Sequence, residues 1–311
     1  MPESRMSMRS TRRGSPFEVV LAAAACLIFV SAAVADDAES VRLAYKFQAN
    51  QSLHFEYTQK MTMDLKRNMF QESIRSQTIA DKHIRVISVD AEGNSLVEPV
   101  IDRARLTSRK DNEPESSFDS ADGEAKCPSE YRSVLATVGK AMVRIKFAPN
   151  GKVLQTVGVN GGEKSAEELR NDASLNFLIV FPDHAIKVGD TWKDDFEINV
   201  QLDRTLKQGI KIRREYRLKK LEGSLAEIEL KTATITPIRE PSIELQVTSR
   251  LLTGTIVFDH VAGQIVSREM KVDQQVINGL GTQSLVHTLM TQSEKVVTNP
   301  RLAKREKAGN E

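Results

Sequence analysis

The sequence predicts a mainly β protein of the α+β class. The expected architecture is a curved antiparallel sheet or half-barrel, built from two related β-meander halves, with two amphipathic helices packed on it. Long stretches of alternating apolar and polar residues, a repeated order of motifs, and only two segments with helical spacing support this class. The 311 residues are 40% hydrophobic, 28% charged and 5% aromatic, which is typical of a globular protein.

The N-terminus is typical of a secretory signal peptide. Met1–Glu18 is polar with a net positive charge, and Val19–Ala35 is a continuous apolar run that ends in the small-x-small pattern Ala33-Val34-Ala35. We therefore expect a signal peptide over residues 1–35, cleavage after Ala35, and a secreted or periplasmic mature protein. The alternative is an uncleaved anchor, because this run is near the shortest that spans a bilayer.

The mature chain has no net charge and cannot form an internal disulfide. The first 35 residues hold four of the 44 basic and two of the 42 acidic residues, so 40 of each remain. Such a chain has no overall field to steer it to nucleic acid. Cys127 is the only mature cysteine. We interpret it as an incidental thiol rather than a nucleophile, because no histidine is near it in sequence.

The first half begins with a long strand. Apolar and polar residues alternate from Leu53 to Leu65, as in a half-buried antiparallel strand. Further on, residues 107–126 are mainly Thr, Ser, Lys, Asp, Asn, Glu and Pro. That composition predicts a flexible polar insertion.

Two segments have helical spacing. Ser165–Glu168 is a capping box, and the apolar residues after it share one face until the chain reaches Pro182. That face carries Leu169, Ala173, Phe177 and Val180. The second, shorter helix is expected over residues 129–139, with Gly139 as its stop. Its apolar face carries Tyr131, Val134, Leu135 and Val138.

The clearest hairpin lies at residues 210–234, around a turn at Gly223. A register in which partner numbers sum to 446 buries apolar pairs and places opposite charges together outside. The inward pairs are then Leu218–Ile228 and Tyr216–Leu230, and the outward pairs are Lys219–Glu227, Arg217–Glu229 and Glu215–Lys231. The basic stretch Lys211–Lys220 is therefore interpreted as a solvated sheet face rather than a nucleic-acid site, since no aromatic residues interleave on it.

Three motifs recur in the same order, which indicates two related halves. Phe47–Leu53 resembles Ile186–Trp192, and each leads into a strand. The hairpin around Gly93 corresponds to the one around Gly223, and Val143–Val153 resembles Thr255–Ile265. The alternative is two generic meanders that share hairpin chemistry.

The predicted organisation follows from these motifs. The first β-rich half spans residues 36–160, and a helix and connector span 161–184. The second half spans 185–298, and 299–311 form a flexible tail. Whether the halves form one continuous sheet or two domains is left open by the sequence.

The chain resembles a group of secreted bacterial proteins of no assigned function. The shared features are a signal peptide, a proline followed by a VGDTW motif (Pro182 and Val188–Trp192), and a late G-x-I-x-F-D hairpin (Gly254–Ile265). The overall pattern is also similar to the curved open sheet of periplasmic lipoprotein carriers. That second resemblance implies an apolar cavity, although fold does not assign function.

No sequence motif indicates a metal, a cofactor or a catalytic centre. The five histidines are not spaced as metal ligands, and phosphate-binding and nucleophile motifs are absent. The histidines are His54, His83, His184, His260 and His287. We therefore expect no enzyme activity, no cofactor and no metal, and no ligand-binding residue can be named.

Two groups of residues still deserve testing against the fold. Asp183-His184, with Asp190, Asp194 and Asp195, could perform acid–base chemistry in a hydrolase. The favoured interpretation is a turn followed by Trp192, which we expect to be mostly buried against the helix carrying Leu169, Ala173 and Phe177. His260 lies in a turn and needs no functional role.

Three functions remain as hypotheses. The first is a non-enzymatic secreted or periplasmic protein that binds an apolar or amphipathic ligand, such as a lipid. The second is an interaction or scaffold module of the cell envelope without a small-molecule ligand, and the third is the hydrolase.

Overall fold

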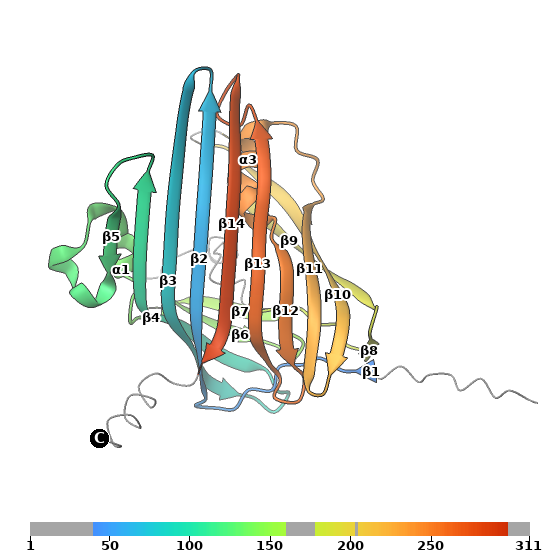
Figure 1. Ribbon diagram of the computed structural model, residues 1–311. Coiled ribbons are helices and arrows are strands. Elements are labelled where there is room, and N and C mark those ends of the chain that lie inside the picture. The colour runs from blue at the N-terminus through green and yellow to red at the C-terminus, as the bar shows by residue number, and fades with distance from the viewer. Residues whose placement is uncertain (1–39, 160–177, 203–204, 298–311) are drawn as a thin grey trace, which may run out of the picture. The chain divides into compact units, whose positions relative to one another are not determined.

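The computed structural model describes residues 40–159, 178–202 and 205–297, and strands dominate them (Figure 1). Twelve of these strands form one antiparallel sheet. The first half contributes β2 (Ser52–Arg67), β3 (Phe70–Val89), β4 (Ser95–Lys110), β5 (Ser116–Asp119), β6 (Val143–Phe147) and β7 (Val153–Gly158). The second half contributes β9 (Thr191–Gln201), β10 (Lys207–Glu222), β11 (Leu225–Thr234), β12 (Thr253–Asp259), β13 (Gln264–Ile277) and β14 (Ser284–Val297).

The two halves join into one continuous sheet. Its order is β7-β6-β4-β3-β2-β14-β13-β12-β11-β10-β9, with β5 beside β4. The halves meet where β2 and β14 pair antiparallel, from Ser284 opposite Arg67 to Val297 opposite His54. Since β7 and β9 lie at the two ends, the sheet is open. The prediction of a mainly β, antiparallel fold is confirmed, and the question of one sheet or two domains is answered in favour of one sheet.

Matching backbone hydrogen bonds occur at the start of each half. Val86 on β3 is bonded in both directions to the Asn50–Gln51 pair that precedes β2. Leu218 on β10 is bonded in the same way to the Gly189–Asp190 pair that precedes β9, at 2.8 and 3.0 Å. These are the motifs that the sequence pairs as equivalents, so their local geometry is repeated as well as their residues.

The segments that lead into the two halves also pair with each other. β1 (Ser40–Val41) precedes β2, and β8 (Ile186–Lys187) precedes β9. They form a separate two-stranded antiparallel sheet, with Val41 opposite Ile186. The segments that lead into the two halves therefore meet, although they are not equivalent positions of the repeat.

The large sheet must curve strongly. Ala104 on β4 and Phe196 on β9 line one and the same cavity, although seven strands lie between them in the sheet. In a flat sheet with strands about 4.8 Å apart, eight steps would separate them by about 38 Å. The strands must therefore bend round a shared interior, as the predicted half-barrel requires.

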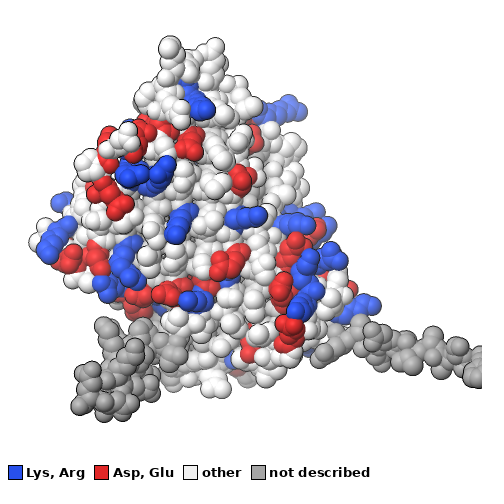
Figure 2. Space-filling model, viewed as in Figure 1, with Lys and Arg blue, Asp and Glu red and all other residues white. Residues whose placement is uncertain are grey.

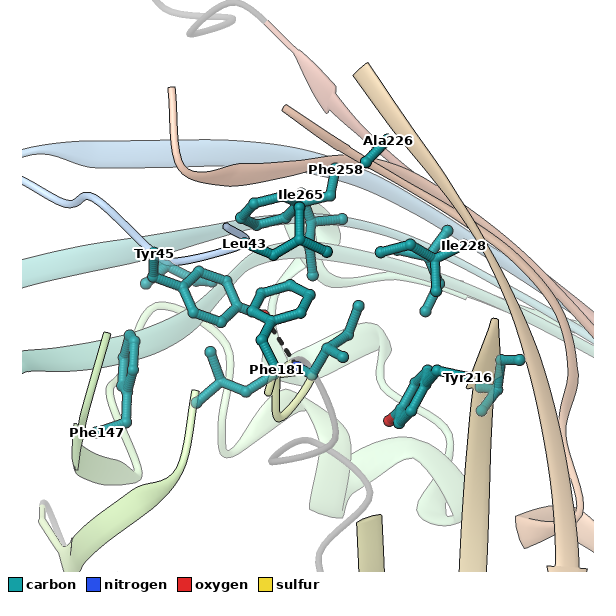
Figure 3. Packing of buried hydrophobic residues seen from close by; sticks show 14 of the residues in the cluster. Leu43, Tyr45, Phe147, Phe181, Tyr216, Ala226, Ile228, Phe258 and Ile265 are labelled. Carbon is teal, nitrogen blue, oxygen red and sulfur yellow. Dashed lines mark hydrogen bonds between the residues drawn. The ribbon is translucent and has the colours of Figure 1, made fainter. Parts of the chain in front are cut away.

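The main core is centred on Tyr45, which precedes β2 (Figure 3). Phe147 and Phe258 both approach its ring edge-on, with centroids 5.6 and 5.5 Å away. Phe181 packs against the same ring at 5.4 Å, and the Tyr45 hydroxyl accepts a hydrogen bond of 2.9 Å from the backbone N–H of Ile179. The two phenylalanines occupy equivalent positions of the repeat, so the halves converge on one aromatic side chain.

The predicted hairpin forms with one irregularity. Glu215–Lys231, Tyr216–Leu230, Arg217–Glu229 and Leu218–Ile228 pair as the sequence indicates. The pair Lys219–Glu227 is wrong, because a bulge at Lys219 places Lys220 opposite Glu227 instead. A bulge inserts one residue on one strand and adds twist, which the alternation of residues does not reveal.

The short predicted helix is present, and an unpredicted one joins it. A 3-10 turn (Ser129–Tyr131) leads into α1 (Arg132–Leu135), and Gly139 follows with a φ of 75°. Helix α3 (Pro241–Val247) has proline in its first turn and buries Ile243 and Val247 against β9 and β10. The sequence did not predict α3, because its pattern of only two apolar residues four positions apart is too short to distinguish a helix from a loop.

The insertion at 107–126 is more regular than its composition predicts. Strand β4 continues to Lys110, and β5 pairs with it from Ser116 to Asp119. Phe118 and Tyr131 stack there with Leu106 and Cys127 in a small apolar cluster. A few apolar residues in a polar stretch therefore suffice to anchor it to the sheet.

Several predictions fall outside the described residues. These are the signal peptide, most of the helix beginning at Ser165 with Leu169, Ala173 and Phe177, and the tail at 299–311. Val180, the last residue of the predicted stripe, is described and is not helical.

Candidate functional site: a charged cavity on the inner face of the sheet

A cavity of about 320 Å³ lies against the inner face of the sheet. One side is formed by β2, β3 and β4 and the other by β9 to β14, while Val134, Leu178 and Leu252 contribute from outside the strands. About half of its lining is apolar: Ala80, Ile101, Ala104, Val134, Leu178, Ile179, Phe196, Leu230, Leu252, Ile256 and Met270. This size is at the lower end of ligand pockets in proteins.

Charged residues also face this cavity, and Glu294 is central to one group. Glu294 on β14 is directly opposite Arg268 on β13, and it forms ion pairs with both Arg268 (3.9 Å) and Lys82. The Lys82 ammonium also lies 4.3 Å from the centre of the Tyr57 ring. Burial opposes ionisation of Glu294, but the charges of Arg268 and Lys82 outweigh it and hold its pKa below the usual value.

A second charged group lies on β9 and β10. Arg214 is directly opposite Asp194, with 3.7 Å between their charged atoms, and its guanidinium stacks 4.2 Å above the Phe196 ring. Burial raises the pKa of Asp194 despite the opposing effect of Arg214. Burial also raises the pKa of the neighbouring Tyr216 to about 12, so its hydroxyl stays protonated.

Uncharged polar groups complete the lining. The Tyr57 hydroxyl donates to Gln59 Oε1 at 2.7 Å, and Gln292 Nε2 donates to the same oxygen at 3.0 Å. By contrast, the buried hydroxyl of Thr232 has no hydrogen-bond partner within the described part of the chain. A buried hydroxyl normally has one, so Thr232 is a position where a ligand atom could bind.

The residues proposed for a hydrolase are not assembled into one site. Asp183 accepts a hydrogen bond from Asn150 (2.9 Å), and Asp190 accepts one from the backbone N–H of Lys187 (3.0 Å). Asp195 pairs with Arg213, while its neighbour Asp194 pairs with Arg214. Consecutive strand residues point to opposite faces, so the last two carboxylates lie on opposite sides of the sheet. His184 is exposed.

The other residues singled out in the sequence make contacts within the fold. His260 Nε2 lies 3.1 Å from the carbonyl oxygen of Gly223 in the neighbouring turn. Cys127 is buried in the cluster with Phe118 and Tyr131. Trp192 is only partly exposed and packs against the core, in contact with Tyr216 and Phe181, while the helix predicted to cover it lies outside the described residues.

Sequence analysis missed the group around Glu294, and it considered Asp194 only as a hydrolase candidate and Arg214 only as part of a solvated face. Lys82, Arg268 and Glu294 occupy inward positions of their strands, where the alternation of residues predicts apolar side chains. A charged residue at an inward position is the signal that would have revealed them. The basic stretch at 211–220 is divided: Arg213 faces outward and pairs with Asp195, as expected of a solvated face, whereas Arg214 lines the cavity, which corrects the prediction for that residue.

The outer surface has no dominant charge. On the face seen in Figure 2, basic and acidic residues are interspersed. None of the helices in the described part of the chain has the length and apolar character needed to cross a bilayer.

Comparisons place the chain near proteins of unassigned function. Residues 163–265 match the model of DUF6263, a family of unknown function, and this segment contains both Val188–Trp192 and Gly254–Ile265. No curated protein matches the chain.

Three solved structures are distantly similar. Lipovitellin, in a structure described by its lipid–protein interactions, has 12% identity and a TM-score of 0.45 over 81% of this chain. This chain spans a quarter (25%) of the lipovitellin chain. DynF, from the dynemicin biosynthesis pathway of Micromonospora chersina, has 6% identity over 86% of this chain and 89% of its own, with a TM-score of 0.23. A DUF1329 family protein from Desulfovibrio piger has 12% identity over 78% and 86%, with a TM-score of 0.16.

Proposed function

We propose that this protein binds, without catalysis, an amphipathic small molecule that has an apolar tail and an anionic head. The observation that carries the proposal is the cavity on the inner face of the sheet, whose apolar lining also holds four basic residues. These are Lys82, Arg214, Arg250 and Arg268, and one carboxylate, Glu294, lines the cavity with them.

The charge of the head follows from the cost of burying cations. A cation taken out of water is destabilising unless an anion lies close to it. The Glu294 carboxylate forms ion pairs with both Lys82 and Arg268, and the Asp194 carboxylate forms one with Arg214. Four basic residues line the cavity, and an arginine guanidinium can donate two parallel hydrogen bonds to a carboxylate or phosphate, so such a head is the complementary ligand group.

The apolar lining accounts for the tail. Burial of apolar surface contributes about 25 cal/mol per Å², so hydrocarbon placed against Ile101, Leu230 and Ile256 stabilises the complex. The Thr232 hydroxyl offers a further hydrogen bond to a polar group near the head.

A pair of adjacent arginines provides a matched test. Arg214 faces the cavity and pairs with Asp194, whereas Arg213 faces outward and pairs with Asp195. Binding of a fluorescent long-chain fatty acid should weaken by about tenfold or more in Arg214→Met, which corresponds to the loss of one charge-assisted contact of about 1.4 kcal/mol. Arg213→Met should bind as the wild type does.

Two further comparisons can refute the proposal. A long-chain alcohol with the same tail should bind more weakly than the fatty acid, and Arg214→Met should not change its affinity. Equal affinity for acid and alcohol, or equal effects of the two arginine changes, would exclude the anionic head. Native mass spectrometry of protein from its own host should show a retained amphiphile. Its absence, together with no fatty-acid binding, would favour the envelope scaffold.

Export is part of the proposal, because ligands of this kind occur at membranes. The apolar run Val19–Ala35 and the pattern Ala33-Val34-Ala35 support cleavage before Asp36. Intact-mass measurement of the protein from its host should show Asp36 as the first residue, in a secreted or periplasmic fraction. A mature chain that keeps residues 1–35 would support the anchor instead.

A further inference from the structure

A histidine–aspartate cluster on the opposite face of the sheet is independent of the cavity. His54 on β2, His83 on β3 and Asp102 on β4 each offer one ligand atom, and these atoms all lie within 4.8 Å of one another. It is the one such group among the residues that the structure describes. Leu53 and Ile84, the chain neighbours of the two histidines, are buried in the core, so the histidines project from the other face.

Strand pairing explains how residues far apart in the chain converge here. His54 and His83 are direct cross-strand partners, and their ring centroids are 5.4 Å apart. Asp102 is the extra residue of a bulge, since Asp81 is opposite Arg103 while Lys82 is opposite Ile101. Bulges redirect side chains, and this one brings the Asp102 carboxylate to 2.8 Å from His83 Nδ1.

We propose that His54, His83 and Asp102 bind a divalent transition-metal ion, with Zn²⁺ as the best match. Two imidazoles and a carboxylate are preferred ligands of Zn²⁺, whereas Mg²⁺ and Ca²⁺ require mostly oxygen ligands. Ligand atoms of a tetrahedral zinc site are about 3.3 Å apart, from bonds of about 2.0 Å. The present separations of up to 4.8 Å exceed this value by at most about 1.5 Å, and the ion would replace the hydrogen bond between His83 and Asp102.

The surroundings leave room for a fourth ligand. His83 and Asp102 line an open hollow with Val100, Gly139 and Ala141, whose far wall is fixed by a 2.7 Å hydrogen bond from Gly139 N–H to Ile101. Arg85 and Lys140 also line the hollow. Arg85 pairs with Glu98, and Lys140 donates to the Ala136 carbonyl oxygen, so both cations already have partners. Water or a small anion could therefore complete the coordination.

A second histidine–aspartate pair on the same face serves as the control. His287 Nε2 lies 2.8 Å from Asp273, but this pair belongs to no three-residue group within the described residues. If a histidine–carboxylate pair were sufficient, both places would bind metal. If a second imidazole is required, only the site that contains His54 will bind metal.

The test is equilibrium dialysis of the tag-free chain against Zn²⁺. Wild type and His287→Gln should each hold about one tightly bound Zn²⁺, while His54→Gln, His83→Gln and Asp102→Asn should each bind at least about tenfold more weakly. The Tm without metal identifies any variant that fails to fold. If a variant does not fold, the absorption spectrum of the wild-type protein loaded with Co²⁺ identifies the ligand type instead. Thiolate bands in that spectrum would indicate a cysteine ligand. Zn²⁺ retained in His54→Gln and His83→Gln, thiolate bands, or no tight wild-type binding would overturn the proposal.

Discussion

Trp192 stacks on Tyr216, its direct partner on the neighbouring strand, with ring centroids 5.3 Å apart and planes inclined by 16°. The equivalent pair in the first half is Leu53 and Ile84, two aliphatic residues. The second half thus replaces an aliphatic contact by an aromatic one at the same place. Trp192 Nε1 also donates a 2.9 Å hydrogen bond to the Val180 carbonyl oxygen, which holds the chain before β8 against the sheet.

Trp192→Ala should lower the free energy of unfolding by about 3 kcal/mol, the lower end of the range for a large aromatic residue, because Trp192 is half-buried. The loss combines the stack on Tyr216 with the hydrogen bond to Val180. Chemical denaturation measures it. Trp192→Phe keeps a ring and loses only the N–H donor, so it should cost about 1 kcal/mol. If the midpoint does not move in Trp192→Ala, the side chain is not part of the core.

Local features of the fold could be predicted from the sequence, and distant ones could not. The hairpin between β10 and β11 follows from alternation and charge over a short stretch, and its register is confirmed at Tyr216 and Leu218. The pairing of β2 with β14 joins residues more than 200 positions apart, and no local pattern specifies it. The bulge at Lys219 leaves no sign in the residues, because it depends on strand twist.

In the candidate sites, too, the sequence shows the residue types but not which residues meet. His54, His83 and Asp102 have no metal-ligand spacing along the chain, and three strands with a bulge bring them together. Glu294 and Lys82 break the apolar alternation, but only the strand order β3-β2-β14 brings them together in the cavity. Their residue types could be read from the sequence, whereas their meeting depends on the topology.

Gly151→Ala should be more destabilising than an ordinary glycine substitution. Gly151 has a φ of 86°, and an added Cβ would lie 2.0 Å from the Ile179 carbonyl oxygen and 2.9 Å from the Tyr45 ring. Gly223 also has a positive φ, 57°, but its Cβ would meet no atom within 4 Å. We expect a cost of about 1 kcal/mol for Gly223→Ala, from backbone strain alone, and about 3 kcal/mol for Gly151→Ala. Equal shifts in the denaturation midpoint would contradict the close approach.

Glu98 should make the stability depend on pH in the acid range. Its side chain is 3% exposed, and Arg85 and Arg144 both donate to it, the latter through Nε at 2.9 Å. Burial raises the pKa of Glu98, but the two arginines together lower it below the usual value. A lowered folded-state pKa means that the stabilisation is complete above the unfolded value of about 4.3 and is lost as the pH falls through the folded value.

Glu98→Gln should therefore lower the free energy of unfolding at pH 7 by about 2 kcal/mol, the scale of hydrogen bonds to a charged group. The difference from wild type should shrink as the pH falls below 4. Glu56→Gln is the control, because the Glu56–Lys295 pair is exposed and contributes at most about 1 kcal/mol. Urea denaturation at several pH values measures both. A difference that stays constant from pH 7 to pH 3 would show that the charge of Glu98 is not responsible.

Glu294→Gln should strengthen the binding of an anionic amphiphile while it destabilises the free protein. The carboxylate of Glu294 forms ion pairs with Lys82 and Arg268, and removal of one partner of a buried ion pair costs about 3 kcal/mol. An anionic head bound in the cavity can then take its place, so a fatty acid should bind about tenfold tighter, whereas an alcohol with the same tail should not.

Glu269→Gln is the matched control, because the adjacent strand position places Glu269 on the outer face, where it accepts a hydrogen bond from Ser293. Titration calorimetry at low ionic strength gives the affinities, and thermal unfolding without ligand gives the stability. Weaker fatty-acid binding in a folded Glu294→Gln protein would mean that the carboxylate itself contacts the ligand, and the preferred head group would then be a cation or a hydrogen-bond donor.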